Sequence, residues 1–436
     1  MINKIVAYIN NKHIDLISSY LTNPFPVELK PMIQNYAWGE TGEAAYIPKL
    51  LGVPAQNKEW AELWIGIHEK APSIVTLDKT DLSLAKLYKI PWLTKILAAK
   101  EMLSIQVHPN KKQALLGYEK EIEQKLPADK RCYLDNNAKP ELAIPLTDFW
   151  LMSDFLPKAK LLKKFGAYAE LVNAFAFELN ALKKAKNAAY ITEAKKNLYS
   201  KIMTLTQPEI NQILKPIAEK IIKENLQKPY TKSNIEYWFL KALEKYAPNG
   251  NYDIGLFSFF LMNLVHLVPF GSKNNYKSAD AIHLKPGQGL FTAAGSPHFY
   301  LEGVCIEQMA NSDNVVRAGL TPKYKNINEL LKIIDYNEKK LAITQPKITK
   351  KEGNLEAHYL NHSNVFDGTY YQTQKGTVES FTATDKLKAV IILKGDLTIR
   401  SDGKDYDFKT GQTFIVPPNK SYEIRANSDL TLFEAS

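Results

Sequence analysis

The stretch MLSIQVHPNKKQA places an amide and an imidazole inside an otherwise apolar segment. In a β-strand, side chains two positions apart share a face, so Ser104, Gln106 and His108 point one way. Ile105 and Val107 point the other way. A buried polar group without a partner costs on the order of a few kcal/mol, so this polar stripe needs partners. It is either the hydrogen-bonded or solvated face of an ordinary strand, or the wall of a site in which His108, together with Gln106, binds a metal ion.

Two further stretches favour the metal site. The segment NNAKPELAIPL places Glu141 at the start of another apolar strand, and AAGSPHFYLEG places His298 just after a glycine turn. Two imidazoles, one carboxylate and one amide provide nitrogen and oxygen ligands that suit zinc or another divalent ion. Water or a substrate would then occupy an open coordination position.

A charged segment, IEQMANSDNVVRAGLTPKY, follows the last of these stretches. It carries Glu307, Asp313, Arg317 and Lys323, and it is too polar for a core and too patterned for a linker. An arginine and a lysine at the mouth of a site suit an anionic phosphate. Taken alone, however, each of these charges is more often a surface group.

The elements that must position these side chains follow from three changes in composition. Residues 31–155 combine short apolar runs with turn residues, which predicts strands mixed with short helices. Residues 156–265 are rich in Ala, Leu, Lys and Glu, with apolar residues every three or four positions, which predicts a helical subdomain. From Ala279 onward, β-type runs alternate with turn residues, apart from a helix near NINELLKIIDY.

An internal repeat indicates the type of β architecture. KPGQGLFTAAGSPHFY begins at Lys285 and KTGQTFIVPPNKSYEI at Lys409, an offset of 124 residues. A glycine–strand–turn–strand unit that occurs twice is typical of the cupin double-stranded β-helix, a jelly-roll barrel. His298 of the first copy aligns with Tyr422 of the second. If the first barrel binds a metal, the second has therefore lost a ligand and is expected to be structural.

Bulk properties exclude several classes of protein. Two cysteines in 436 residues argue against a disulfide framework and fit a reducing cytosol. The net charge of +10 lies almost entirely in residues 157–250, which hold 17 Lys and 8 Glu on solvated helix faces, so no nucleic-acid role is expected. The first residues lack a signal-peptide pattern. The apolar run Ile254–Phe270 is too short and too polar for a membrane span and is expected to form a buried helix.

Together these stretches closely resemble the type I mannose-6-phosphate isomerases. The resemblance covers roughly residues 31–325 in the family's order, with a weaker cupin match up to the C-terminus. It rests on the segments IQNYAWG, WAELWIGIHEKAPS, LSIQVHPNK, KPELAIPLTDF, DIGLFSFFLMNLVHL, AGSPHFYLEG and MANSDNVVRAGLTPKY. It implies the reversible interconversion of mannose 6-phosphate and fructose 6-phosphate at a zinc site, through a cis-enediol intermediate.

The resemblance also implies roles for individual residues. The implied zinc ligands are Gln106, His108, Glu141 and His298, the same set that the strand pattern suggests. Arg317 matches the family's catalytic arginine, and Lys139 matches another active-site position. Positions that hold the sugar phosphate are matched by Lys95, Ser104 and Lys323. Pocket-lining positions are matched by Trp38, Tyr300, Glu307 and Asp313. Proton transfer is left open among Glu307, Lys139 and a metal-bound water.

One departure from the family pattern affects the chemistry. The family commonly has histidine where this chain has Ala138, in the segment Asn137–Glu141. Ring opening must then use another group, such as His68, or be slow with closed-ring substrate. Ala138 also favours an alternative, a non-catalytic cupin that senses sugar phosphates. A third possibility is that the chain isomerises a related sugar phosphate.

The expected fold is therefore mixed and mainly β, with cupin-type jelly-roll barrels and an inserted all-α subdomain. We expect an N-terminal helical extension (1–30), a catalytic zinc-binding cupin domain (31–155 and 266–330), a helical insert (156–265) and a C-terminal cupin domain without metal ligands (331–436). The expected ligand is a hexose 6-phosphate, and the protein is expected to be cytoplasmic, without membrane or nucleic-acid partners. A monomer is expected, with a dimer as the alternative.

Overall fold

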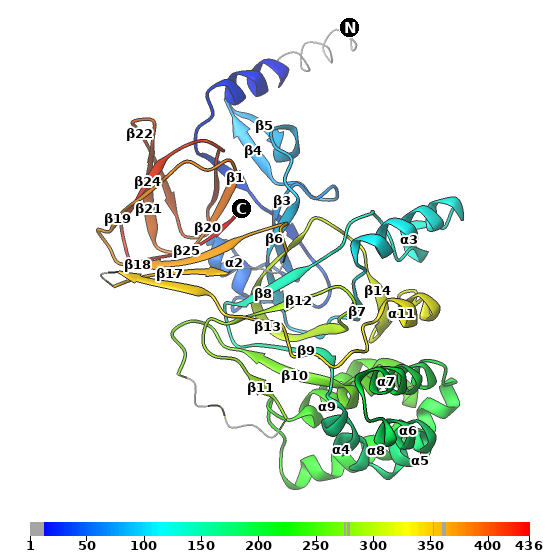
Figure 1. Ribbon diagram of the computed structural model, residues 1–436. Coiled ribbons are helices and arrows are strands. Elements are labelled where there is room, and N and C mark those ends of the chain that lie inside the picture. The colour runs from blue at the N-terminus through cyan, green and yellow to red at the C-terminus, as the bar shows by residue number, and fades with distance from the viewer. Residues whose placement is uncertain (1–12, 274–275, 277–279, 352, 360–362) are drawn as a thin grey trace. The chain divides into compact units, whose positions relative to one another are not determined.

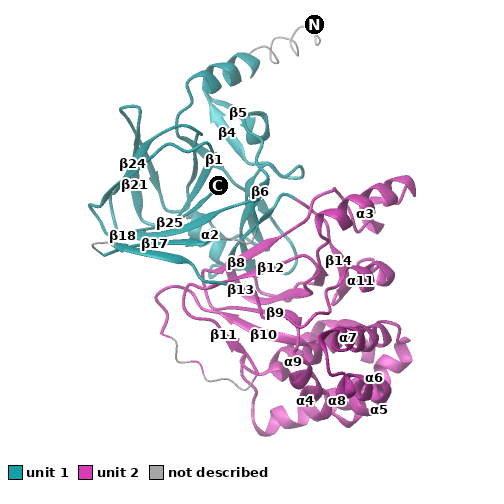
Figure 2. Ribbon diagram, viewed as in Figure 1, with its two compact units in different colours: residues 1–98, 306–311, 344–436 teal, residues 99–305, 312–343 magenta. Residues whose placement is uncertain are grey.

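The computed structural model describes the chain except for residues 1–12, 274–275, 277–279, 352 and 360–362 (Figure 1). It divides into two compact units, each built from separate segments of the chain (Figure 2). Unit 1 comprises residues 1–98, 306–311 and 344–436, and unit 2 comprises residues 99–305 and 312–343. The predicted extension 1–30 falls partly outside the described residues, and residues 13–22 within it are helical.

Unit 2 contains the β-structure that carries the candidate metal ligands. One sheet has the order β14-β7-β13-β9-β10-β11, and β8 pairs with β12. Every pairing for which a register is given is antiparallel except that of β10 with β11. The strands are β7 (Ile105–Val107), β8 (Glu141–Pro145), β9 (Phe149–Phe155), β10 (Met262–Leu267), β11 (Ile282–His283), β12 (Gly289–Thr292), β13 (His298–Ala310) and β14 (Val316–Gly319). The last residues of β13, from Ile306, belong to unit 1.

The predicted helical subdomain is present between β9 and β10. Apolar side chains at helical spacing, such as Leu161, Phe165, Leu198, Ile217 and Trp238, are buried in one continuous core. The capping box at the start of α8 satisfies main-chain groups that the helix leaves open. The helices are α4 (Lys158–Gly166), α5 (Ala169–Ala174), α6 (Ala176–Lys184), α7 (Ala188–Met203), α8 (Gln207–Gln227) and α9 (Ile235–Tyr246). Helix α3 (Lys111–Glu123) follows β7, and the helix predicted near NINELLKIIDY is α11 (Ile327–Ile333).

The apolar run Ile254–Phe270 is buried as predicted, but the prediction of a helix is wrong. It forms a 3₁₀ turn (Ile254–Phe257), a single helical turn (α10, Ser258–Leu261) and strand β10. The side-chain amide of Asn263 donates to the main-chain oxygens of Ser153 and Asp154, each at 3.1 Å, beside a register shift between β10 and β9. A buried strand reads as a continuous apolar run, so periodicity alone could not distinguish it from a helix. Among the described residues, no helix is both long and apolar enough to cross a membrane.

Unit 1 holds the remaining β-structure. Its nine-stranded sheet has the order β16-β17-β18-β25-β20-β23-β1-β4-β5, and a four-stranded sheet has the order β19-β24-β21-β22. The N-terminal segment contributes β1 (Val27–Lys30), β2 (Met32–Gln34), α2 (Tyr46–Leu51), β3 (Glu62–Gly66), β4 (Ile74–Leu77), β5 (Thr80–Ser83) and most of β6 (Trp92–Ala99). The C-terminal strands are β16 (Lys347–Lys351), β17 (Asn354–Tyr359), β18 (Gly368–Thr373), β19 (Val378–Phe381), β20 (Lys388–Lys394), β21 (Asp396–Ser401), β22 (Lys404–Lys409), β23 (Thr413–Val416), β24 (Tyr422–Ala426) and β25 (Leu430–Ala435).

The internal repeat is confirmed as a repeat of structure. Strands β12 and β13 begin 124 residues before β23 and β24. Gly287 and Gly411 both have a positive φ, of 79° and 84°. The side chain of Gln288 accepts from the main-chain nitrogen of Lys285 at 2.7 Å, and Gln412 does the same for Lys409 at 2.9 Å. The mainly β, jelly-roll fold with a helical insert is therefore as predicted, whereas the four domain boundaries stay a prediction.

Candidate metal centre

The strand that carries His108 alternates as predicted. Ile105 and Val107 are buried in the hydrophobic core, while Gln106 is half-buried on the opposite face. Gln106 lies directly opposite His298 of β13 on one side and Arg317 of β14 on the other. Directly opposite residues of an antiparallel pair point to the same face, so three predicted site residues form one row across three strands.

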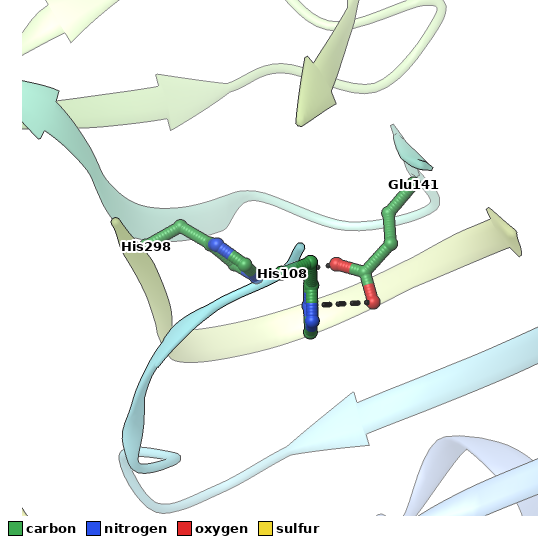
Figure 3. A group of neighbouring side chains, drawn as sticks. All are labelled: His108, Glu141 and His298. Atoms are coloured by element: carbon green, nitrogen blue, oxygen red, sulfur yellow. Dashed lines mark ion pairs between the residues drawn. The ribbon is translucent and has the colours of Figure 1, made fainter. Parts of the chain in front are cut away.

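Three of the four predicted metal ligands lie together. His108, Glu141 and His298 are all buried, and each offers a ligand atom within 4.8 Å of the others. Nε2 of His108 lies 3.2 Å from Oε1 of Glu141, and Nε2 of His298 lies 3.2 Å from Oε2. Figure 3 shows the three side chains converging from three different parts of the chain. The hypothesis of an ordinary solvated strand face does not account for this convergence.

Main-chain carbonyl groups orient both imidazoles. Nδ1 of His108 lies 2.7 Å from the main-chain oxygen of Asn314, and Nδ1 of His298 lies 3.0 Å from that of Ser296. A carbonyl oxygen only accepts hydrogen bonds, so each Nδ1 carries the proton. In the neutral form of each ring, Nε2 is then the unprotonated nitrogen that a metal ion requires.

The charges of the site follow from burial and from the close contacts. Burial lowers the pKa of His108 to about 4, so its ring is neutral near pH 7. Burial alone would raise the pKa of Glu141, but Lys139 and His108 hold it well below its usual range. The ammonium group of Lys139 lies 3.1 Å from Oε1 of Glu141. Burial would lower the pKa of His298, but its hydrogen bond to Glu141 and the charge of that carboxylate raise it. The site therefore combines a carboxylate with the neutral imidazole of His108, and a metal ion would displace any proton from Nε2 of His298.

A cationic cavity of about 470 Å³ lies in the same unit and includes Arg317, Lys323 and Asp313 in its lining. Lys130 and Arg131 also line it. Neither was predicted from sequence, because both lie in a polar stretch without any motif. Four cations and two carboxylates, Asp129 being the second, give this cavity a positive balance suited to an anion. Burial lowers the pKa of the Arg317 guanidinium, which nevertheless stays charged near neutral pH.

The other predicted residues of unit 2, Tyr300, Ser104 and Asp313, lie on or beside the strands that carry the candidate site. The buried ring of Tyr300 lies two residues after His298 on β13, and the ring centroids are 6.3 Å apart. Ser104 is half-buried immediately before β7. The main-chain nitrogen of Asp313 donates to Asp135 at 3.0 Å, which anchors the loop before β14.

The remaining predicted residues belong to unit 1. The ammonium group of Lys95 is buried 2.9 Å from Oε2 of Glu307 and 3.5 Å from Oε1 of Glu62. Glu62 was not predicted from sequence, because it lies in an otherwise apolar strand. Trp38 is half-buried with its ring stacked on Tyr36.

His68, the predicted substitute for the missing histidine in ring opening, also belongs to unit 1. It is buried, and its Nδ1 accepts from the main-chain nitrogen of Lys70 at 3.3 Å. Its ring packs against that of Trp64, with the centroids 4.8 Å apart. These contacts do not show whether His68 takes part in ring opening, so that role stays a prediction.

Known proteins resemble this chain over most of its length. The family of phosphomannose isomerase type I catalytic domains matches residues 27–158. The chain is 30% identical over 361 residues to a probable mannose-6-phosphate isomerase of Echinococcus multilocularis. This alignment covers 73% of this chain and 76% of the relative. It is 29% identical over 412 residues to the mannose-6-phosphate isomerase of Escherichia coli, covering 89% and 94%.

Solved structures agree with these relationships. A variant of phosphomannose isomerase from Salmonella typhimurium superposes with a TM-score of 0.75 at 27% identity, covering 94% of this chain and 99% of that one. A zinc-bound mannose 6-phosphate isomerase superposes with a TM-score of 0.74 at 27% identity, covering 94% and 98%. The resemblance predicted from the sequence is thereby confirmed: the chain belongs to the type I mannose-6-phosphate isomerase family.

Proposed function

We propose that this chain is a zinc-dependent isomerase that interconverts mannose 6-phosphate and fructose 6-phosphate through a cis-enediol intermediate. The observation that carries the proposal is the buried His108–Glu141–His298 group. A family member of the same fold has been solved with zinc bound. Membership of the family and an intact candidate metal centre support the same reaction.

The residues present fit a zinc ion. Nε2 of His108 is buried and faces the carboxylate of Glu141 at 3.2 Å without a hydrogen bond among the described residues, and an ion held between the two groups would satisfy both. Two imidazole nitrogens and a carboxylate are a usual set of protein ligands for catalytic zinc. Gln106 is the proposed fourth ligand, since it lies opposite His298 in the sheet register.

Isomerisation requires a proton to move between C1 and C2 while negative charge develops on oxygen. Bound zinc supplies Lewis-acid polarisation of the sugar oxygens at this point. Arg317 lies in the same row as Gln106 and stabilises the developing negative charge. Lys139 and Glu307 are the proposed proton carriers, and Lys139 is already 3.1 Å from the carboxylate of Glu141.

The phosphate group is proposed to bind in the cationic cavity of unit 2. Arg317 and Lys323 line it, and Lys130 and Arg131 add two further cations. Planar guanidinium groups bind phosphate oxygens in pairs, and lysines contribute point charges. Lys95 and Ser104, predicted from the resemblance to hold the phosphate, remain proposals, as do Trp38, Tyr300 and Asp313 for the sugar.

A coupled assay tests the proposal directly. The purified chain is given mannose 6-phosphate, and fructose 6-phosphate is measured with zinc present and after complete chelation. We expect turnover that chelation abolishes and added zinc restores. No turnover in the zinc-loaded protein would refute the enzyme and favour the sensor that Ala138 suggests. Turnover that survives complete metal removal would refute the zinc mechanism.

The same proposal includes a cytoplasmic monomer without nucleic-acid or membrane partners. The lysines of the helical subdomain lie among Ala, Leu and Glu at helical spacing, without a recognisable nucleic-acid-binding motif in the sequence, which supports the exclusion of nucleic acid. Light scattering on the purified chain would give the oligomeric state, and a dimer would correct this part of the proposal.

A further inference from the structure

A second, larger cavity lies inside the C-terminal barrel of unit 1. It has a volume of about 770 Å³, within the range of small-molecule sites in proteins. Strands β17, β18, β19, β20, β24 and β25 supply most of its lining, which includes Glu356, Tyr371, Glu379, Phe381 and Glu434. All of its lining residues belong to the segment 349–436, so the cavity is complete within one unit.

The structural repeat relates this cavity to the candidate metal centre. In the first barrel Thr292 of β12 pairs with Glu141, and in the second Val416 of β23 pairs with Lys388. Thr292 and Val416 are separated by the 124-residue offset of the repeat. Lys388 therefore occupies the place of Glu141. By the same offset Tyr422 occupies the place of His298, at the start of the next strand.

Because of these two replacements, the second barrel lacks two of the metal ligands and carries a hydrogen-bonded group of side chains in their place. The ammonium of Lys388 lies 3.0 Å from Oε1 of Glu434 and donates to the hydroxyl of Tyr422 at 3.1 Å. That hydroxyl donates to Oε2 of Glu434 at 2.9 Å. Burial raises the pKa of Tyr422, so the phenol stays protonated and is not an anionic ligand. An ammonium group now stands where a metal ligand would be, which disfavours a metal ion.

The lining also disfavours an anionic ligand. It contains five carboxylates but only two lysines, and each lysine is paired with a carboxylate of the cavity. Lys386 lies 2.6 Å from Asp367, and Lys388 is paired with Glu434. A phosphorylated sugar would therefore meet an acidic surface.

The polar groups of the lining suit hydroxyl groups instead. Carboxylates, amides and hydroxyls from Asn354, Glu356, Thr369 and Glu379 can accept from and donate to a polyol. The ring of Phe381 stacks on that of Tyr422 with centroids 4.7 Å apart, and Tyr371 meets it edge-on at 5.9 Å. Aromatic rings provide flat apolar surface for the CH groups of a sugar ring.

We propose that the C-terminal barrel binds a neutral polyhydroxylated molecule, a sugar of one or two rings or a sugar alcohol, without metal and without a phosphate group. The barrel has a cavity of its own, and Lys388 and Tyr422, bonded to Glu434, stand at the positions of two metal ligands of the first barrel. This site is separate from the proposed catalytic centre and does not depend on the reaction assigned to it. From sequence this barrel is expected to be structural, whereas the cavity gives it a binding role.

Methyl NMR of the zinc-loaded full chain tests the proposal, because Ile424, Leu430 and Leu432 line the cavity. The probes are maltose and D-mannitol, two neutral molecules without phosphate. We expect maltose or mannitol to shift these methyl signals saturably, and we expect the same shifts after zinc is removed. Mannose 6-phosphate should leave these signals unchanged at concentrations that saturate catalysis.

Paired variants locate the binding. Glu356→Gln combined with Glu379→Gln replaces two lining carboxylates by amides and should weaken binding of the neutral probe at least about tenfold. Glu423→Gln makes the same change on β24 outside the lining and should leave the affinity unaltered. The proposal is overturned if neither neutral probe shifts these methyl groups, if mannose 6-phosphate shifts them more strongly, or if the paired variant binds as tightly as the original chain.

Discussion

The ring of His108 and the main chain of Asn314 are joined by a hydrogen bond of 2.7 Å between Nδ1 and the carbonyl oxygen. The side chain of Asn314 is itself held on both sides. Its amide nitrogen donates to the main-chain oxygens of Asp135 and Asn137, each at 2.8 Å, and its oxygen accepts from the main-chain nitrogen of Leu134 at 2.7 Å. One buried amide thus ties the loop before Glu141 to the carbonyl group that orients His108.

Replacing Asn314 by alanine should weaken zinc binding by about 10–100-fold, because groups that orient metal ligands typically have effects of this size. The side-chain contacts that hold both the loop and the carbonyl would be lost. Competition with a chelating dye measures the zinc affinity. Asn136→Ala, an exposed residue of the same loop, is the matched control. Unaltered zinc affinity in Asn314→Ala would show that the main-chain carbonyl group that orients His108 is positioned by other contacts.

His298→Ala should abolish stoichiometric zinc in the purified protein, since it removes one of three buried ligand atoms. Tyr422→Phe, at the equivalent position of the second barrel, should retain one zinc per chain. Elemental analysis of dialysed protein gives both values. Full zinc in the His298 variant would contradict the ligand assignment.

Arg317→Lys should lower kcat by about 100-fold, as expected when one preorganised donor to developing negative charge is lost. Lysine keeps the positive charge but lacks the planar fork of donors. Zinc content should stay at one per chain, because Arg317 is not among the proposed ligands. A kcat near that of the original enzyme would exclude Arg317 from charge stabilisation.

Lys130→Gln should raise KM for mannose 6-phosphate by about tenfold and leave kcat nearly unchanged, because it removes one cation from the proposed phosphate cavity. Lys120→Gln changes a lysine of α3 that does not line the cavity and serves as the control. Steady-state kinetics at fixed ionic strength separates the two parameters. Equal KM values in the two variants would place the phosphate elsewhere.

Glu302 should make the stability of unit 2 depend on pH. Burial would raise its pKa, but hydrogen bonds from Lys232 and Lys241 hold it below the usual value. A carboxyl group with a lowered pKa in the folded state stabilises the fold above its unfolded pKa, and this contribution disappears as the pH falls through the folded pKa.

Glu302→Gln should therefore be less stable by about 1 kcal/mol at pH 7, and the difference from the original chain should shrink as the pH falls below the unfolded glutamate pKa of about 4.3. Urea unfolding at a series of pH values from 7 downward measures the difference. Glu101→Gln breaks a more exposed ion pair with Lys245 and should change stability by no more than about 0.5 kcal/mol. A stability difference for Glu302→Gln that is constant with pH would contradict the assigned interaction.

The features that were predictable from sequence are those set by local rules. The alternation of Ile105 and Val107 with Gln106 follows from the two-residue period of a strand. The 124-residue repeat was visible because both copies need glycine at the same positive-φ turn and glutamine at the same main-chain contact. The metal ligands stood out because polar residues at the edges of apolar strands need partners.

The features that sequence reasoning missed depend on contacts between distant residues. The helix expected in Ile254–Phe270 became a turn and a strand, because pairing with β9 outweighed an ambiguous apolar pattern. Lys130 and Arg131 belong to no motif and were recognised only as lining of a cavity with Arg317. Lys388 and Glu141 are equivalent because of how their strands pair, whereas the two side chains themselves are unlike.

The sequence alone determined the fold class, the family and the types of side chain that could hold a metal ion, because periodicity and motif order are properties of neighbouring residues. Only the tertiary structure decided that His108, Glu141 and His298 lie within ligand distance of one another. It also decided that the second barrel carries an ion pair and a cavity in place of a metal centre. Both depend on which strands pair and in what register, and that is settled by the packing of residues far apart in the chain.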